Sequence, residues 1–162
     1  LLIIKYSRIV ESILIKSWII MEALLNMIKS NKNLVKSFVL AINKSDWESL
    51  SHIVAQNFVR HSYAAGEPGV KSCQDLIKFL QSELQTFPDG REELLDIVAE
   101  GNKVAARHRF SGTQSGPLGS FPPTGKKMVV EYIAIYRIEN GCIVEAWVEW
   151  DNKSGLTQLG HE

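Results

Sequence analysis

The residues in the last third of the chain that could take part in chemistry are a histidine and several aromatic residues. His108, Tyr132, Tyr136 and Trp150 all stand at even-numbered positions within runs rich in β-branched and aromatic residues. An imidazole can take or give a proton near neutral pH, and aromatic rings can form a wall for a ring-shaped ligand. The same residue types also fill protein cores, so the pattern favours acid–base chemistry only where these side chains surround a cavity.

Two predicted β-hairpins position these residues. The runs 129–138 and 142–151 flank Asn140-Gly141, and Asn-Gly between strand-like runs is the strongest short-range signal for a hairpin. The runs 92–100 and 103–111 flank Gly101-Asn102 in the same way. We therefore expect two antiparallel hairpins that together form a four-stranded antiparallel sheet.

Side chains alternate between the two faces of a strand, so the even-numbered positions of the runs 103–111, 129–138 and 142–151 share one face. That face is mostly apolar, and we expect it to line the interior with Val104, Ala106, His108, Phe110, Val130, Tyr132, Ala134, Tyr136, Val144, Ala146, Val148 and Trp150. The opposite face carries charged side chains that can pair across strands, namely Arg107, Arg109, Arg137, Glu131, Glu145 and Glu149.

Three apolar residues interrupt the charges on the outer face. Ile133, Ile135 and Trp147 would form an exposed apolar patch in a monomer, and such patches usually mark an interface. A homodimer or a larger homo-oligomer that packs through this face would bury the patch. We therefore expect a second copy of the chain as a partner.

The first part of the chain predicts helices that cover the sheet. Apolar residues recur at helical spacing over 31–42, and Ser45 with Glu48 matches a capping box for a second helix that ends near residue 55. Ser72 begins a third helix, which Pro88 ends, while the run 58–63 resembles a short strand or an extended arm. Three N-terminal helices packed against a curved antiparallel sheet indicate an α+β cone with a pocket at its open end.

The composition is that of one globular domain. Of the 162 residues, 45% are hydrophobic and 22% are charged, and the formal net charge is 0. A balanced charge gives no long-range attraction to nucleic acid or to an anionic membrane, so we expect neither partner. Cys73 and Cys142 have the spacing of neither a zinc site nor a redox motif, and we expect two reduced structural thiols and no metal.

The first 26 residues form a segment of unusual composition. It is rich in Ile and Leu but is interrupted by Lys5, Arg8, Glu11, Lys16 and Glu22. A membrane span needs about 20 apolar residues with few charges, and a secretory signal needs a cleavage site of small residues, so the segment matches neither. It is either upstream sequence, with Met21 or Met27 as the true start, or an additional amphipathic helix. We expect 1–26 to be an extension, 27–162 to be the domain, and the protein to be cytoplasmic.

Several segments together carry a resemblance to a known family. They include NKNLVKSFVLAINKSDWESLSHIVAQNFVRHS from Asn31, the loop FPPTGKKM, the hairpin YIAIYRIENGCIVEAWVEWDN and the ending TQLG. In order and spacing they resemble the SnoaL-like polyketide cyclases, in particular the predicted ester cyclases, within the nuclear transport factor 2-like superfamily. The resemblance covers roughly residues 31–160.

The resemblance implies a cone-shaped α+β barrel that is usually oligomeric through its outer sheet face and uses no metal or organic cofactor. Its best-known members close a ring of a polyketide methyl ester by intramolecular aldol condensation, which needs a base for the acidic α-proton and a donor for the enolate oxygen. A histidine of the ester-cyclase branch matches His61. The resemblance therefore implies His61 as a proton-transfer group. Alternation along the strands adds His108 as a second one, with Phe110, Tyr132, Tyr136, Val148 and Trp150 as candidate substrate contacts on the same face.

The chain departs from the family pattern at three polar positions. The usual catalytic Asp of the last strand falls at Val148, and two family histidines fall at Ala134 and Gln114. Three interpretations stay open: a cofactor-independent cyclase or isomerase acting on a small apolar carbonyl or ester compound, a non-catalytic module that binds a small apolar molecule, and a dimeric scaffold of the same fold.

Overall fold

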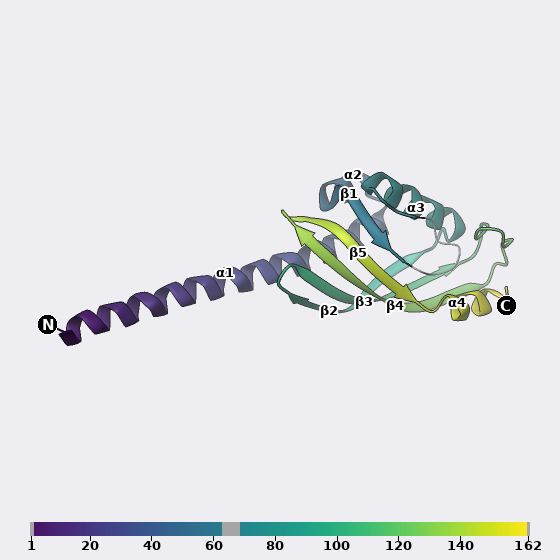
Figure 1. Ribbon diagram of the computed structural model, residues 1–162. Helices are drawn as coiled ribbons and strands as arrows, with labels where there is room; N and C mark the ends of the chain where they lie inside the picture. The colour runs from purple at the N-terminus through teal and green to yellow at the C-terminus, as the bar shows by residue number, and fades with distance from the viewer. Residues whose placement is uncertain (1, 63–68, 162) are drawn as a thin grey trace.

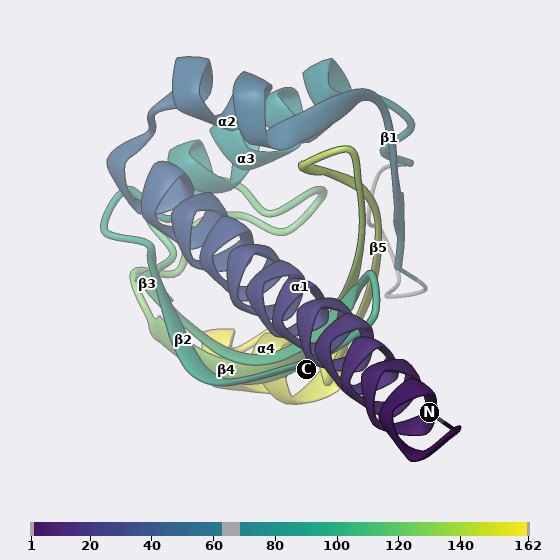
Figure 2. The same cartoon turned by 90° about the vertical axis from the view of Figure 1, so that its left-hand side faces the viewer.

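A curved sheet forms the centre of the molecule, and helices lie across its concave side (Figures 1 and 2). The computed structural model describes residues 2–62 and 69–161, with side chains from residue 11 onward. The elements are α1 (Leu2–Lys44), α2 (Trp47–Ile53), β1 (Val54–His61), α3 (Cys73–Thr86), β2 (Arg91–Glu100), β3 (Lys103–Thr113), β4 (Lys127–Glu139), β5 (Cys142–Trp150) and α4 (Asn152–Leu159). The α+β class predicted from the sequence is confirmed.

The two predicted hairpins are confirmed. Strands β2 and β3 pair antiparallel across the turn at Gly101, and β4 and β5 pair antiparallel across Asn140-Gly141. Asn140 and Gly141 have φ angles of 51° and 75°, the left-handed pair that a tight type I′ turn requires. Strand β4 pairs with β3 along the whole length of β3, so the hairpins join into one sheet.

The sheet has a fifth strand, which corrects the prediction of a purely antiparallel four-stranded sheet. Strand β1 pairs parallel with β5, with Arg60 opposite Ala146 and His61 opposite Trp147, so the strand order is β1-β5-β4-β3-β2. The sequence indicated only an arm at 58–63, preceded by a helix reaching residue 55. The strand begins earlier because Val54 and Phe58 are both needed in the core, where each is 1% exposed.

Helix α1 is longer than the first predicted helix. The helical spacing covered 31–42, whereas α1 continues without a break from Leu2 to Lys44. Its C-terminal part packs on the sheet through Val35, Phe38 and Val39, and its N-terminal part projects away from the domain (Figure 1). The projecting part exposes large apolar side chains such as Trp18, which is 60% exposed. Within the described residues, no helix combines the length and apolar character needed to cross a membrane.

The helix starts follow capping chemistry, with one correction. Ser72 caps α3 as predicted, since its hydroxyl accepts a hydrogen bond from the Asp75 backbone N–H. Helix α2 is capped by Asp46 and not by Ser45, because the Asp46 carboxylate accepts from the Ser49 backbone N–H at 3.0 Å. Ser45 instead takes a left-handed φ of 53° and links α1 to α2.

Two hydrophobic clusters hold the fold together. The larger one joins α1, α2 and α3 to the inner face of the sheet around residues such as Val35, Leu50 and Ile143. The smaller one lies at the end of the sheet next to α4, where Phe87, Met128, Val130 and Leu159 are buried. Helix α4, which the sequence did not indicate, begins at an Asp151 cap and closes this end.

Candidate active site

The inner face of the sheet carries the residues that alternation assigned to it, with one exception. Val104, Ala106, His108, Ala134 and Tyr136 are all buried on this face, as predicted. Val144 is the exception, because β5 contains a bulge: Arg137 pairs with Glu145 while Ile138 pairs with Ile143, which leaves Val144 as the extra residue. The bulge turns Ile143 inward and Val144 toward the outer face.

Three of the predicted site residues come together on this inner face. The His108 Nε2 atom lies 3.1 Å from the Tyr136 hydroxyl oxygen, and His108 is completely buried. The His108 and Tyr132 rings stack at a centroid distance of 4.7 Å and an angle of 5°. One histidine and two phenols, all from β3 and β4, therefore form a single contiguous group.

Glu92 joins this group from β2, and the sequence analysis did not single it out. The Glu92 Oε1 atom accepts a hydrogen bond from the Tyr132 hydroxyl and lies 3.3 Å from His108 Nδ1. Nδ1 has no partner with hydrogen-bond geometry among the described residues, so its contact with Glu92 is electrostatic. Glu92 is 9% exposed, which makes this a buried carboxylate–imidazole pair.

Both phenols of the group are held in their neutral form. Burial raises the pKa of Tyr132 well above its ordinary value, and the Glu92 charge raises it further. Tyr132 is partly exposed as a residue, but its hydroxyl end is enclosed. Burial also raises the pKa of Tyr136, as does the Glu92 charge, while Arg60 opposes them. Each phenol is therefore a hydrogen-bond donor at neutral pH.

The arrangement selects one tautomer of His108. A carboxylate next to Nδ1 favours a proton on that nitrogen, which leaves Nε2 as the acceptor for the Tyr136 hydroxyl. The result is a carboxylate–imidazole–phenol chain formed by Glu92, His108 and Tyr136. In such a chain the imidazole can accept a proton while the carboxylate offsets the positive charge.

The other predicted substrate contacts lie at different places on the inner face. Val148 is buried opposite Ala134 in the larger cluster. Phe110 and Trp150 pack against the smaller cluster beside α4, where the Phe110 ring meets the Phe87 ring edge-on at 5.3 Å. These two aromatic residues belong to the closed end of the sheet.

The structure does not bring His61 and His108 together, which corrects the expectation that both face one hollow. His61 lies on the outer face, where its Nε2 atom is 2.8 Å from Glu145 Oε1 and its ring stacks on Trp147 at 5.4 Å. The parallel pairing of His61 with Trp147 fixes this orientation, because directly paired residues share a face. The hydrogen bond from His61 lowers the pKa of Glu145, and Arg137 adds to this effect.

Arg60, the neighbour of His61, faces inward and was also missed. It pairs with the buried Ala146, and its guanidinium lies 4.9 Å from the centre of the Phe79 ring. It is close enough to lower the pKa of Tyr136 against the effect of burial. Alternation along β1 could have revealed Arg60 once the strand and its direction were known.

The outer face carries the predicted charge pairs. Arg107 binds Asp96 and Glu131, each at 2.6 Å, and Arg109 binds Glu131 at 2.9 Å. The hydrogen bonds from Arg109 and Arg107 lower the pKa of Glu131. Glu131 and Glu145 therefore point outward, as alternation predicted.

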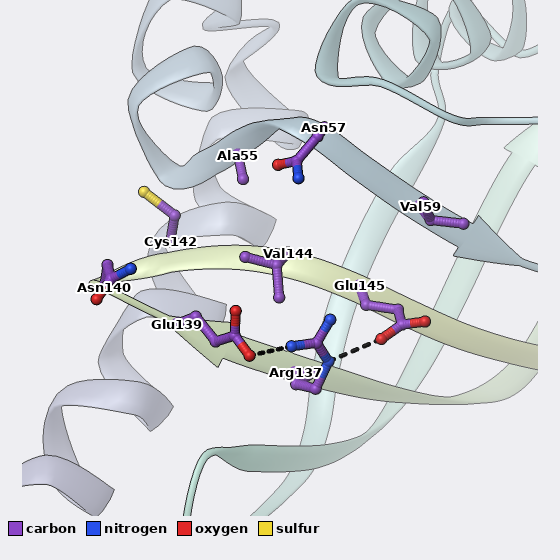
Figure 3. Close-up of a pocket in the computed structure, with 9 residues that line it drawn as sticks. All are labelled: Ala55, Asn57, Val59, Arg137, Glu139, Asn140, Cys142, Val144 and Glu145. Carbon is purple, nitrogen blue, oxygen red and sulfur yellow. Dashed lines mark hydrogen bonds and ion pairs between the residues drawn. The ribbon is translucent and has the colours of Figure 1, made fainter.

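A pocket of about 470 Å³ lies on this outer face, between β1 and the β4–β5 hairpin. Figure 3 shows Arg137 between Glu139 and Glu145, to both of which it is linked, with Asn57 and Val144 above it. The pocket exists because the pairing of β1 with β5 shifts register between Val54 and Val59. Across the described parts of the chain, no group of His, Cys, Asp and Glu could hold a metal ion.

The chain is similar to known proteins, both in sequence and in structure. The sequence profile of the SnoaL-like polyketide cyclases matches residues 32–159. Among solved structures, IdmH from Streptomyces antibioticus, a proposed polyketide cyclase, is 30% identical with a TM-score of 0.69, over 80% of this chain and 98% of its own. TsrD from Streptomyces laurentii is 29% identical with a TM-score of 0.74, over 83% and 97% of the two chains.

A third similar structure has a different described activity. AclR from Streptomyces galilaeus, a proposed hydroxylase, is 27% identical with a TM-score of 0.72, over 83% of this chain and 98% of its own. No curated protein matches the chain.

Proposed function

The chain belongs to the SnoaL-like polyketide cyclase family, and from that premise we propose that it carries out cofactor-independent acid–base chemistry on a small apolar carbonyl or ester compound. The reaction is an aldol-type cyclisation or an isomerisation, in which a proton leaves the carbon next to a carbonyl group. The inner group of Glu92, His108, Tyr132 and Tyr136 supports this proposal, because it supplies a base and donors side by side.

In the proposed mechanism His108 is the base and Tyr136 is the donor. His108 and Tyr136 are buried, so the side chains that cover them must move apart before the substrate carbonyl oxygen can take the Tyr136 hydrogen bond away from His108 Nε2. The freed nitrogen lone pair then accepts the α-proton. Nε2 and the hydroxyl oxygen are 3.1 Å apart, so both can reach one carbonyl and its α-carbon. The enolate charge is stabilised by a donor whose raised pKa keeps its own proton in place.

Glu92 and Tyr132 complete the proposed mechanism. The Glu92 carboxylate offsets the charge that His108 gains, and the Tyr132 hydroxyl bond holds the carboxylate in place. Phe79, Leu80 and Leu94 are partly buried apolar side chains that pack against the cluster containing Tyr136, and they favour an apolar substrate over a charged one. Substrate contacts are assigned to Tyr132 and Tyr136, while His61 is left out because it faces the opposite side of the sheet.

A second candidate function is binding without catalysis. The positions that resemble the catalytic Asp and a histidine of the family hold Val148 and Ala134, which pair with each other in the core and carry no ionisable group. A module of this kind would hold the same apolar ligand and leave its α-proton in place.

The partner proposed for either function is a second copy of the chain. Ile133 and Ile135 are 55% and 39% exposed on the outer face, next to the partly exposed Trp147. A homodimer that packs these residues together would remove a contiguous apolar patch from water.

Deuterium exchange at carbon 1 of 2-tetralone, an apolar bicyclic ketone, tests the proposed chemistry. His108→Gln is expected to slow the exchange catalysed by the protein by about 100-fold, the usual contribution of a positioned base. His52→Gln is the matched control, because His52 is exposed on α2 away from the inner face. Equal exchange by both variants would refute the assignment of His108, and binding of 2-tetralone without exchange would favour the second candidate.

A further inference from the structure

The site depends on a strand that has only one neighbour. Strand β2 lies at the edge of the sheet and pairs only with β3, yet it carries Glu92. Glu92 is the second residue of the strand, where an edge strand with no other partner would fray. Something outside the sheet must therefore hold the backbone of Glu92 if its carboxylate is to stay beside His108.

We propose that Asn43 is the positioning residue that directs the Glu92 carboxylate into the inner group. The inference rests on the proposed function of that group. Asn43 is the last residue but one of α1, and the hydrogen bonds of its side chain go to the Glu92 backbone. It acts on the chemistry only through Glu92.

The geometry is a two-way clamp between one side chain and one backbone residue. The Asn43 Nδ2 atom donates to the Glu92 carbonyl oxygen at 2.8 Å, and the Glu92 backbone N–H donates to Asn43 Oδ1 at 2.9 Å. The amide group thus takes the place of a residue on a neighbouring strand. Both backbone groups of Glu92 at the free edge of β2 are satisfied, which leaves its peptide a single orientation.

The clamp is attached to a rigid part of the molecule. Next to Asn43 on α1, Val39 and Ala41 are buried at 5% and 4% exposure in the larger cluster. On the other side of Glu92, strand β2 is interrupted by a bulge between Leu94 and Asp96, so the sheet alone fixes Glu92 weakly. The position of Glu92 relative to His108 is therefore set from α1.

A second asparagine on the same helix provides a matched control. Asn31 Nδ2 donates to the Gly101 carbonyl oxygen at 3.1 Å and so ties α1 to the turn at the other end of β2. Asn31→Ala removes a bond between α1 and the β2–β3 hairpin but leaves Glu92 clamped. A purely structural role for Asn43 predicts that the two alanine variants behave alike.

The test compares Asn43→Ala with Asn31→Ala by two measurements on the full chain. The first is the ¹⁵N spectrum of His108, assigned with His108→Gln, which reports the tautomer directly. The second is deuterium exchange into 2-tetralone. Asn43→Ala is expected to convert the single tautomer into a mixture and to slow exchange about tenfold, because small displacements of a base are costly. Asn31→Ala is expected to change neither.

The outcomes separate this inference from the proposed function. Equal spectra in the two variants would overturn the role of Asn43. A wild-type protein that catalyses no exchange would refute the proposed function, while the spectra would still decide on Asn43. If Asn43→Ala does not fold, Asn43→Asp replaces it, because it keeps the acceptor for the Glu92 N–H, loses the donor and adds a negative charge. An unchanged His108 tautomer in Asn43→Asp, with the Glu92 carbonyl bond lost, would likewise overturn the inference.

Discussion

The buried phenols give the protein a specific weakness at alkaline pH. In the unfolded chain a tyrosine ionises near pH 10, whereas Tyr132 and Tyr136 keep their protons to higher pH in the folded state. Burial and the Glu92 charge are the causes in both cases. This weakness can be measured by comparing the free energy of unfolding between pH 7 and pH 11 for the wild-type protein, Tyr132→Phe and Tyr136→Phe.

The sign and size of the effect follow from proton counting. A raised folded-state pKa gives stability that is complete below the unfolded pKa and is lost as the pH rises above it. Above pH 10 the unfolded state releases a proton that the folded state retains, so each phenol lowers the free energy of unfolding by about 1.4 kcal/mol per pH unit. The two phenols together give about 2.7 kcal/mol per unit, and each Phe variant removes half of this.

Urea unfolding at each pH provides the measurement. Burial also raises the pKa of the Cys73 thiol, so this thiol adds a further loss of stability at alkaline pH. The loss is the same in every variant and cancels when the variants are compared. The difference between wild type and Tyr136→Phe should therefore be constant up to about pH 9.5 and then shrink. Parallel curves up to pH 11 would show that Tyr136 ionises as readily in the folded state, which would refute the enclosed inner group.

Three further predictions concern other parts of the chain. A thiol reagent is expected to modify the partly exposed Cys142 within the time in which the buried Cys73 stays unmodified, and equal rates would contradict the packing of α3. A chain without residues 1–26 should keep the wild-type midpoint of thermal unfolding, because the buried residues of α1 begin at residue 31. His61→Ala should raise the pKa of Glu145, visible in its carboxyl ¹³C titration, and no change would place His61 elsewhere.

The sheet and its two faces could be predicted because their signals are local. Asn140-Gly141 fixes a turn by its own backbone preferences, and alternation then decides the face of every residue until a bulge occurs. His108, Tyr132 and Tyr136 were grouped correctly on this basis. Val144 was not, because the bulge in β5 depends on how that strand pairs with β4 and not on its own sequence.

Glu92 shows where alternation fails. Ala99 and Ile97 pair with the buried Val104 and Ala106, and counting back by twos from them assigns Glu93 to the interior. The bulge between Leu94 and Asp96 inserts one residue, so Glu92 faces inward instead. Two adjacent leucines at 94 and 95 give no indication of which one faces the core.

The error about His61 has a different cause, which is long-range pairing. Parallel pairing of β1 with β5 joins residues more than 80 positions apart, and no turn motif specifies its register. One step of register decides whether His61 or Arg60 enters the interior. A sequence alone therefore predicts that one of the two lies inside, but not which one.

The position of the inner group bears on whether the family chemistry survives in this chain. The residues that resemble the usual catalytic positions, Ala134 and Val148, face each other on β4 and β5. The ionisable side chains lie one or two strands away, on β2 and β3, and reach β4 through Tyr132 and Tyr136. A buried carboxylate–imidazole pair costs stability relative to apolar residues of the same size. Under the proposed function, this pair and the two phenols take the part in proton transfer that the apolar Ala134 and Val148 cannot take.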